Sequence, residues 1–145
     1  MVALAALVAV SSAAAGNDPK SLTLEVTNAN LRGQYGKVWP RLHPRYRAVT
    51  TRSFWESCQR KRGSDRAGAE FLSLKVTETY PDRITLPLLG RLGVTAVSIE
   101  ARVKYLGETT TVRDTVYVTK VSGTWFGLWD PETYRSYKAK RCPTS

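Results

Sequence analysis

Asp114 is the carboxylate whose position in the sequence best suits acid–base chemistry. It lies in a strand-like stretch, residues 112–118, where it alternates with three valines. Ideal pleating points Asp114 at the apolar face of a sheet, where burial would raise its pKa and let it act as a base. The alternative is a β-bulge at residues 113–114, or a strand end, that turns the carboxylate to solvent and pairs it with an arginine. Tyr117 has the opposite parity, so without a bulge at most one of the two side chains faces the same pocket.

His43 is the single histidine and a second candidate for a general base or a metal ligand. It lies between Leu42 and Pro44, and neither a second histidine nor a carboxylate stands at ligand spacing. The alternative is a histidine at a corner of the chain that bonds to the backbone. We therefore predict no metal and no other cofactor, and the absence of a nucleophile elbow leaves no catalytic residue assigned. Three further aromatic side chains either line the mouth of a pocket or belong to the core, namely Tyr35, Trp39 and Tyr105.

The chain is strongly basic, with 22 Lys and Arg against 12 Asp and Glu and a formal net charge of +10. Its 145 residues, 42% of them hydrophobic, suit one packed domain. A charge of this size attracts an anionic component of the cell envelope, or else it is a solvated surface without a partner. Nucleic acid is not the expected partner, because the basic clusters lack the ordered aromatic interleaving of a single-strand binding platform.

Residues 1–15 have the composition of a secretory signal peptide, with a short apolar run followed by small residues and an A-x-A site. The run is shorter than the ~20 residues of a membrane-spanning helix. We expect cleavage near Ala15, a short linker over residues 16–21, and a secreted or cell-envelope location. No basic residue precedes the run. The alternative is therefore the trimmed end of a longer membrane anchor, the one case in which a membrane partner is expected.

Hydrophobic spacing predicts helices followed by strands. Apolar residues at helical spacing cover residues 31–42, with a break at Pro40, and a second helix begins at Thr50 or Thr51 and ends at Cys58. The period then changes to two, which is typical of strands. The expected strands cover residues 72–76, 84–88, 97–105, 109–121 and 124–129, with the first turn at residues 80–82. This order predicts an α+β domain whose N-terminal helices pack on a curved antiparallel sheet of four to five strands.

Cys58 and Cys142 are the two cysteines, and their spacing matches no metal or redox motif. In an exported protein such a pair usually closes into a disulfide, and the alternative is two separate thiols. The basic tail, residues 131–145, shows no apolar periodicity of its own. The predicted disulfide would therefore fasten this tail to the helical pair.

Three short motifs carry a family resemblance through their order and spacing. They are W-x-x-L-H-P at residues 39–44, F-x-x-x-C at residues 54–58 and G-x-W at residues 123–125. Together they resemble the nuclear transport factor 2-like superfamily, in particular its exported members in high-GC Gram-positive bacteria, over residues 22–130. The resemblance implies a cone-shaped domain, in which a strongly bent sheet wraps around helices and a pocket opens between them. Superfamily members include ketosteroid isomerases, dehydratases, polyketide cyclases and non-enzymatic binding or assembly domains, and no local motif transfers their catalytic residues to this chain.

Three functions follow as hypotheses. The first is a secreted, non-catalytic domain that binds a small apolar ligand or a cell-envelope partner. The second is an isomerase or dehydratase that uses Asp114 with a tyrosine. The third is a membrane-anchored assembly protein, if the apolar N-terminus is the end of an anchor. The candidate pocket residues are Tyr35, Trp39, His43, Tyr105, Asp114 and Tyr117.

Overall fold

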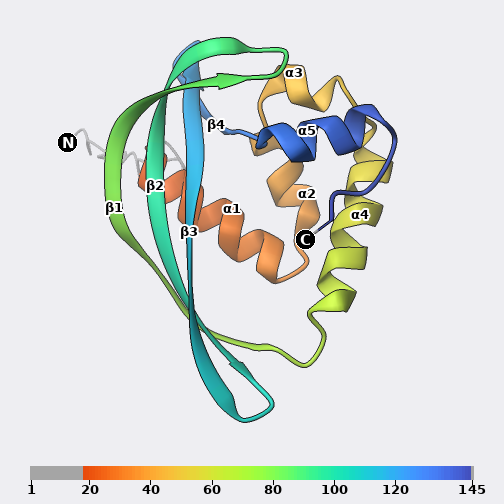
Figure 1. Cartoon of the computed structure of the whole chain (residues 1–145), viewed down its shortest axis with the longest axis vertical. Coiled ribbons are helices and arrows are strands. Elements are labelled where there is room, and N and C mark those ends of the chain that lie inside the picture. The colour runs from red at the N-terminus through yellow and green to blue at the C-terminus, as the bar shows by residue number, and fades with distance from the viewer. Residues whose placement is uncertain (1–17, 145) are drawn as a thin grey trace, which may run out of the picture.

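The computed structural model describes residues 18–144, so the expected signal peptide lies outside the described residues. Helices come first, strands follow, and a last helix returns to the helical side (Figure 1). The helices are α1 (Pro19–Leu31), α2 (Tyr35–Val38), the short 3-10 helix η1 (Trp39–Arg41), α3 (Pro44–Arg47), α4 (Arg52–Asp65) and α5 (Pro131–Lys138). The strands are β1 (Glu70–Leu86), β2 (Gly90–Tyr105), β3 (Glu108–Val121) and β4 (Thr124–Gly127). Over residues 18–144, no helix is long and apolar enough to cross a membrane.

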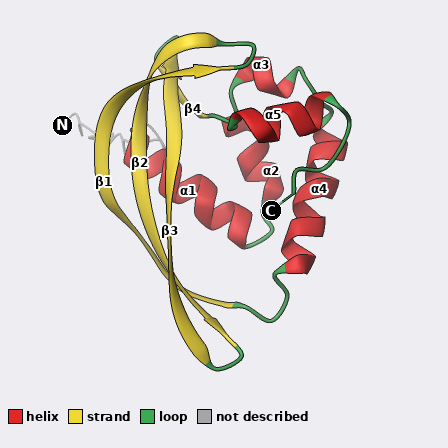
Figure 2. Ribbon diagram, in the orientation of Figure 1, coloured by secondary structure: helices red, strands yellow, loops and turns green. Residues whose placement is uncertain are grey.

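The four strands form one antiparallel sheet in the order β1-β2-β3-β4, and the helices lie on one side of it (Figure 2). This confirms the predicted α+β architecture. The predicted turn at residues 80–82 is wrong, because β1 continues through it and Pro81 pairs with Thr95 of β2. Since β1 is an edge strand, one of its sides has no hydrogen-bonded neighbour, and a residue without an N–H is tolerated there.

Helix α1 packs on the concave side of the sheet and begins earlier than the sequence predicts. The Asp18 side chain caps it by accepting a hydrogen bond of 2.9 Å from the backbone N–H of Ser21, and Pro19 takes the first helical position. Residues 19–21, predicted to be a linker, are therefore helical. The fully buried Leu22 joins α1 to the sheet through a cluster with Val97, Ile99 and Val118.

The single helix expected over residues 31–42 is divided into pieces. Helix α1 already ends at Leu31, and Gly33 then takes a φ of +71°, which a residue with a side chain adopts only at a cost. Helix α2 starts after this turn. The predicted break at Pro40 is present, because α2 gives way there to the 3-10 helix η1. Helix α4 begins at one of the two predicted caps, since the Thr51 hydroxyl accepts a hydrogen bond of 3.2 Å from the N–H of Phe54.

A cluster of aromatic rings forms the core between the helices. The Tyr46 ring stacks on that of Trp129 with centroids 5.1 Å apart, and Trp129 stacks in turn on Tyr137 at 4.7 Å. On the α4 side, the rings of Trp55 and Trp39 lie 5.4 Å apart. This core therefore combines residues that precede the sheet with residues that follow it.

The residues after the sheet form a docked helix, which corrects the prediction of a tail without apolar periodicity. Asp130 caps α5 by accepting a hydrogen bond of 2.8 Å from the N–H of Thr133. Tyr134 and Tyr137, three residues apart on one face of α5, are both buried. Two tyrosines are thus enough to give this short helix an inner face.

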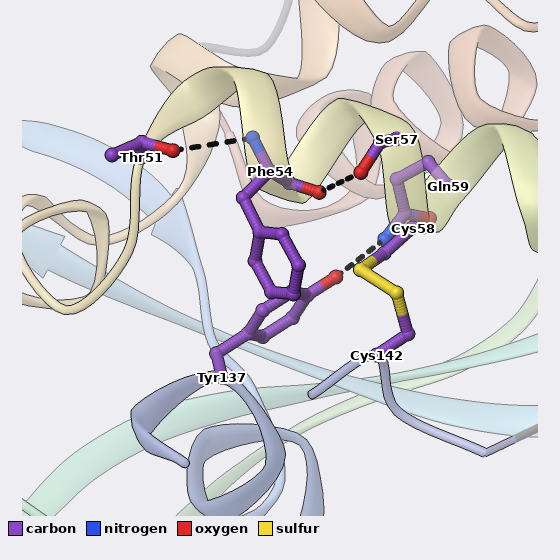
Figure 3. The surroundings of a disulfide bond; sticks show 7 residues. All are labelled: Thr51, Phe54, Ser57, Cys58, Gln59, Tyr137 and Cys142. Carbon is purple, nitrogen blue, oxygen red and sulfur yellow. Dashed lines mark hydrogen bonds between the residues drawn. A yellow bond between two sulfur atoms is a disulfide. The ribbon is translucent and has the colours of Figure 1, made fainter. Parts of the chain in front are cut away.

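Cys58 and Cys142 form the predicted disulfide, with Cα atoms 5.2 Å apart (Figure 3). The residue after Cys58, Gln59, donates a hydrogen bond of 3.1 Å from Nε2 to the hydroxyl of Tyr137 (Figure 3). The ring of Phe54 packs edge-on against the same tyrosine, with centroids 6.3 Å apart. The disulfide therefore lies beside a contact between α4 and α5 that burial and hydrogen bonding already support.

Candidate functional site

A cavity of about 500 Å³ opens between the helices and the sheet. Its walls come from α1, from Tyr35 at the start of α2, from Gly63 of α4 and residues 66–69 after it, and from one face of β1, β2 and β3. This volume lies within the range of small-molecule sites in proteins, roughly 300–1,000 Å³. We treat the cavity as the candidate site.

The sheet side of the cavity is mainly apolar. Ile99, Ala101 and Val103 alternate along β2 and line it, and Phe71 and Leu74 of β1 extend this wall. The side chain of Ala101 is small and stands between two larger ones, which leaves room in the middle of the wall. An apolar wall of this kind favours the carbon skeleton of a ligand.

The curvature around the cavity has a local cause in β1. The register between β1 and β2 shifts twice, between Phe71 and Ser73 and between Val76 and Glu78. A β-bulge adds a residue to one strand, bends it and increases its twist. The two bulges therefore curve the sheet around the helices and keep its inner face from packing flat against α1.

Asp114 lines the cavity, as ideal strand alternation predicts. The register between β2 and β3 is continuous and places Asp114 opposite Ile99, so the predicted alternative of a bulge at residues 113–114 is wrong. The side chain is nevertheless exposed, and its Oδ1 accepts a hydrogen bond of 2.8 Å from the N–H of Thr115. Asp114 therefore points into the cavity without the burial that a desolvated general base requires.

Besides Thr27, three more polar side chains belong to the cavity wall, and each is held differently. The hydroxyl of Tyr35 donates a hydrogen bond of 3.1 Å to the carbonyl oxygen of Gln59. The Nε of Arg66 donates to the carbonyl oxygen of Arg62 at 3.3 Å. The side-chain oxygen of Asn30 is buried and has no hydrogen-bond partner among the described residues. The wall thus combines an unpaired acceptor, a carboxylate and a guanidinium.

His43 and Trp39 lie in the helical core, away from the cavity walls. The Nδ1 of His43 accepts a hydrogen bond of 3.2 Å from the N–H of Arg45, and its backbone N–H donates to the carbonyl oxygen of Gly127 at 3.0 Å. Burial lowers the pKa of His43 below its ordinary value of 6.5, and the charges of Arg45 and Arg47 add to this effect. The geometry is that of the corner histidine bonded to backbone, one of the two predicted alternatives.

The remaining two candidate residues also lie outside the cavity wall. Tyr105 is 53% exposed at the end of β2. Tyr117 lines a separate cavity of about 190 Å³, together with residues 84–86 and 128–131. Of the predicted pocket residues, Tyr35 and Asp114 are therefore the ones that the structure brings together. Among residues 18–144, no three His, Cys, Asp or Glu side chains lie close enough together to hold a metal ion.

Sequence reasoning missed Asn30, Arg66 and Ala101 as wall residues. The strand alternation around Ala101 predicts the face to which its side chain points. It does not predict that the space beside this side chain is open. Asn30 and Arg66 carry no local signal, because their positions depend on where α1 and α4 end and how both ends face the sheet.

The comparisons with known proteins support the fold. No protein-family model matches the chain, and no curated protein matches it. The structure is similar to the solution structure of a SEC-C motif containing protein from Rhodopseudomonas palustris, with a TM-score of 0.54. The match covers 79% of this chain and 78% of that chain, at 14% sequence identity. At this identity the similarity concerns the arrangement of the backbone alone.

Proposed function

We propose that the protein is a non-catalytic binding domain that holds a small, mostly apolar molecule in the cavity between α1 and the sheet. The observation that carries the proposal is the cavity itself, about 500 Å³ in volume, with an apolar wall along β1 and β2. A site of this size buries most of the surface of a small ligand, and apolar burial contributes roughly 25 cal/mol per Å².

The polar groups in the wall narrow the chemistry of this ligand. Asp114 offers a carboxylate, and the side-chain oxygen of Asn30 is an acceptor without a partner among the described residues. A buried acceptor without a hydrogen bond is unfavourable, and most buried acceptors in native structures have a partner. We therefore expect a ligand with a compact apolar skeleton and at least one hydroxyl or N–H donor. Rotation of the Asn30 amide would let its oxygen accept a hydrogen bond from this donor.

The same proposal includes export and a place in the nuclear transport factor 2-like superfamily. The disulfide between Cys58 and Cys142 supports an oxidising compartment. Helices that precede a curved antiparallel sheet, with a cavity between them, support the superfamily. The mass of the mature protein tests export, because cleavage near Ala15 would remove the apolar N-terminal run.

Binding can be tested with N-phenylnaphthylamine, an uncharged dye that carries one N–H and fluoresces in apolar surroundings. Because the dye is neutral, the positive charge of the protein does not attract it. We expect saturable binding by the wild-type protein.

The variant Ala101→Phe fills the middle of the wall and should abolish binding. Ala48→Phe adds the same ring at an exposed position after α3 and should leave binding unchanged. Equal binding by the two variants, with both folded, would refute the cavity as the site.

An isomerase or dehydratase is the second candidate, because Asp114 and Tyr35 line the same cavity. Its test is the exchange of the α-hydrogens of an enolisable ketone with deuterated water, followed by NMR. Exchange that is fast with the wild type and lost in Asp114→Asn, with dye binding retained, would favour the enzyme. We expect no protein-dependent exchange, since Asp114 is exposed and the hydroxyl of Tyr35 is already bonded to Gln59.

A further inference from the structure

The positive charge of the protein is concentrated in its helical part. Residues 18–69 and 128–144 contain 15 Lys and Arg against 6 Asp and Glu, a net charge of +9. The sheet, residues 70–127, contains 7 basic against 6 acidic residues, a net charge of +1. A partner drawn by charge would therefore meet the helices and not the sheet.

Helix α4 and the residues after α5 meet at the disulfide, and a shallow hollow lies on each side of this junction. One hollow, of about 340 Å³, includes Arg135 and Arg141. The other, of about 190 Å³, includes Lys61 and Arg62. Both hollows share Cys142 and Thr144, so residues 142–144 form a ridge between them. We call these two hollows and the ridge the basic junction.

The cations of the basic junction are available for a ligand. None of the four forms an ion pair with a carboxylate of residues 18–144, whereas Arg52 and Arg60 elsewhere on α4 both pair with Glu56. Each hollow also includes one carboxylate, Glu132 in the larger and Asp65 in the smaller. We infer that the basic junction binds a flexible linear polymer of phosphate groups, laid across the ridge so that successive phosphates meet the two hollows.

The surroundings of the junction favour such a polymer over a bilayer or a nucleic acid. Across residues 18–144, the large apolar side chains that are exposed lie on α1, on the sheet or in its turns, and none lies on α4, α5 or the residues after it. A bilayer would therefore find no side chain to insert there. Tyr134 and Tyr137 of α5 are buried, so bases would find no ring on which to stack. Phosphate groups without bases or acyl chains match what this surface offers.

Titration with long-chain inorganic polyphosphate, at several salt concentrations, tests the inference. The double variant Lys61→Gln/Arg141→Gln removes one cation from each hollow. We expect a several-fold loss of affinity, and a slope of log K against log salt that is smaller in magnitude by about 1.4, as for two lost contacts to a single strand.

The matched control Arg102→Gln/Lys104→Gln removes two cations from β2 and should change neither the affinity nor the slope. Glu132→Gln, which removes the opposing carboxylate, should raise the affinity. Equal losses in both double variants would show unspecific attraction and overturn the inference.

The disulfide provides a second and independent readout. Because it holds Arg141 against α4, the variant Cys58→Ser/Cys142→Ser should bind polyphosphate several-fold more weakly, although its net charge is unchanged. Circular dichroism should show that this variant remains folded. Tighter binding of single-stranded DNA or of anionic phospholipid vesicles than of polyphosphate would assign the junction to another partner and refute the inference. The hollows and the cavity share no lining residue, so the outcome does not depend on the proposed binding of an apolar ligand.

Discussion

The hydroxyl oxygen of Tyr35 lies 3.0 Å from the position that a Cβ atom would take on Gly63. Tyr35 is buried, and its hydroxyl donates to the carbonyl oxygen of Gln59, one turn earlier in α4. A side chain at residue 63 would therefore press on a hydroxyl that is already held on its other side. The glycine lets α4 and the start of α2 approach each other closely where the cavity wall begins.

This contact predicts coupling between two substitutions. In an unstrained helix, Gly→Ala stabilises by about 1 kcal/mol. In the wild type, Gly63→Ala should stabilise less than this or destabilise, because the new methyl group displaces the Tyr35 hydroxyl. In a Tyr35→Phe background the obstacle is gone, and the full gain should appear. Urea unfolding of the four proteins measures the coupling. An identical effect of Gly63→Ala in both backgrounds would contradict the close approach.

Replacing Asn30 with an apolar residue should raise the stability of the protein and weaken ligand binding. Its side-chain oxygen is a buried acceptor without a partner among the described residues, and such groups cost about 1–3 kcal/mol. Asn30→Leu should raise the free energy of unfolding by about 1 kcal/mol and weaken dye binding. Asn28→Leu, on the same helix but outside the cavity wall, controls for the change in helix propensity. If the two variants were equally stable, the unpaired oxygen would have no energetic consequence.

Because His43 titrates, we expect the stability of the protein to depend on pH between about 7 and 5. Its pKa in the folded protein lies below 6.5, so in this window the unfolded chain binds more protons than the folded one. The stabilisation is present above pH 6.5 and is lost as the pH falls through the lower, folded value. Protonation of Nδ1 would also end the hydrogen bond from Arg45.

Urea unfolding at several pH values measures this dependence. His43→Asn can still cap α3 but does not titrate, so its stability should change less between pH 7 and 5. Hydrogen bonds from Arg52 and Lys75 lower the pKa of Glu56 and Glu100, respectively, below 4.5. The stability that these two carboxylates contribute is therefore lost only under more acidic conditions. Equal pH profiles of the wild type and the variant would show that His43 is not the titrating group.

Reduction of the disulfide should lower stability without releasing α5. The bond joins residues 84 positions apart, and disulfides typically contribute about 2–4 kcal/mol. Tyr137 should stay docked, because its ring is buried and its hydroxyl is bonded to Gln59. We expect a lower urea midpoint, unchanged near-ultraviolet circular dichroism and faster proteolysis after Ala139. Loss of the aromatic signal on reduction would show that the bond alone holds the helix.

The sequence predicted the features that depend on a local pattern, and it predicted the disulfide. The alternation around Ile99 marked β2, the Thr51 cap marked the start of α4, and the two cysteines pair as expected. The prediction failed at Pro81, where the pattern for a turn competes with the tolerance of an edge strand for proline. It also failed at α5, although Asp130 followed by proline is a recognised helix start, because two tyrosines give a weak apolar signal.

The candidate site was less predictable than the fold. Strand parity correctly directed Asp114 to the inner face, but the sequence could not show that this part of the face is open. Trp39 and His43 were candidates for the pocket as well as for the core, because aromatic and basic side chains suit both. Their packing against Trp55 and Tyr46 is a property of the assembled helices, which no local pattern records.

The aromatic core has a consequence for the order in which the chain is made. Tyr46, Trp55 and Cys58 precede the sheet, whereas Trp129 and Tyr137 follow it. During synthesis, the first group therefore lacks these later partners until residues 129–142 have left the ribosome. A chain that stops before Trp129 would expose these rings and a free thiol, features that chaperones and proteases recognise. The disulfide can therefore form only once Cys142 is available, and the residues after the sheet cover aromatic rings that the earlier part of the chain would leave exposed.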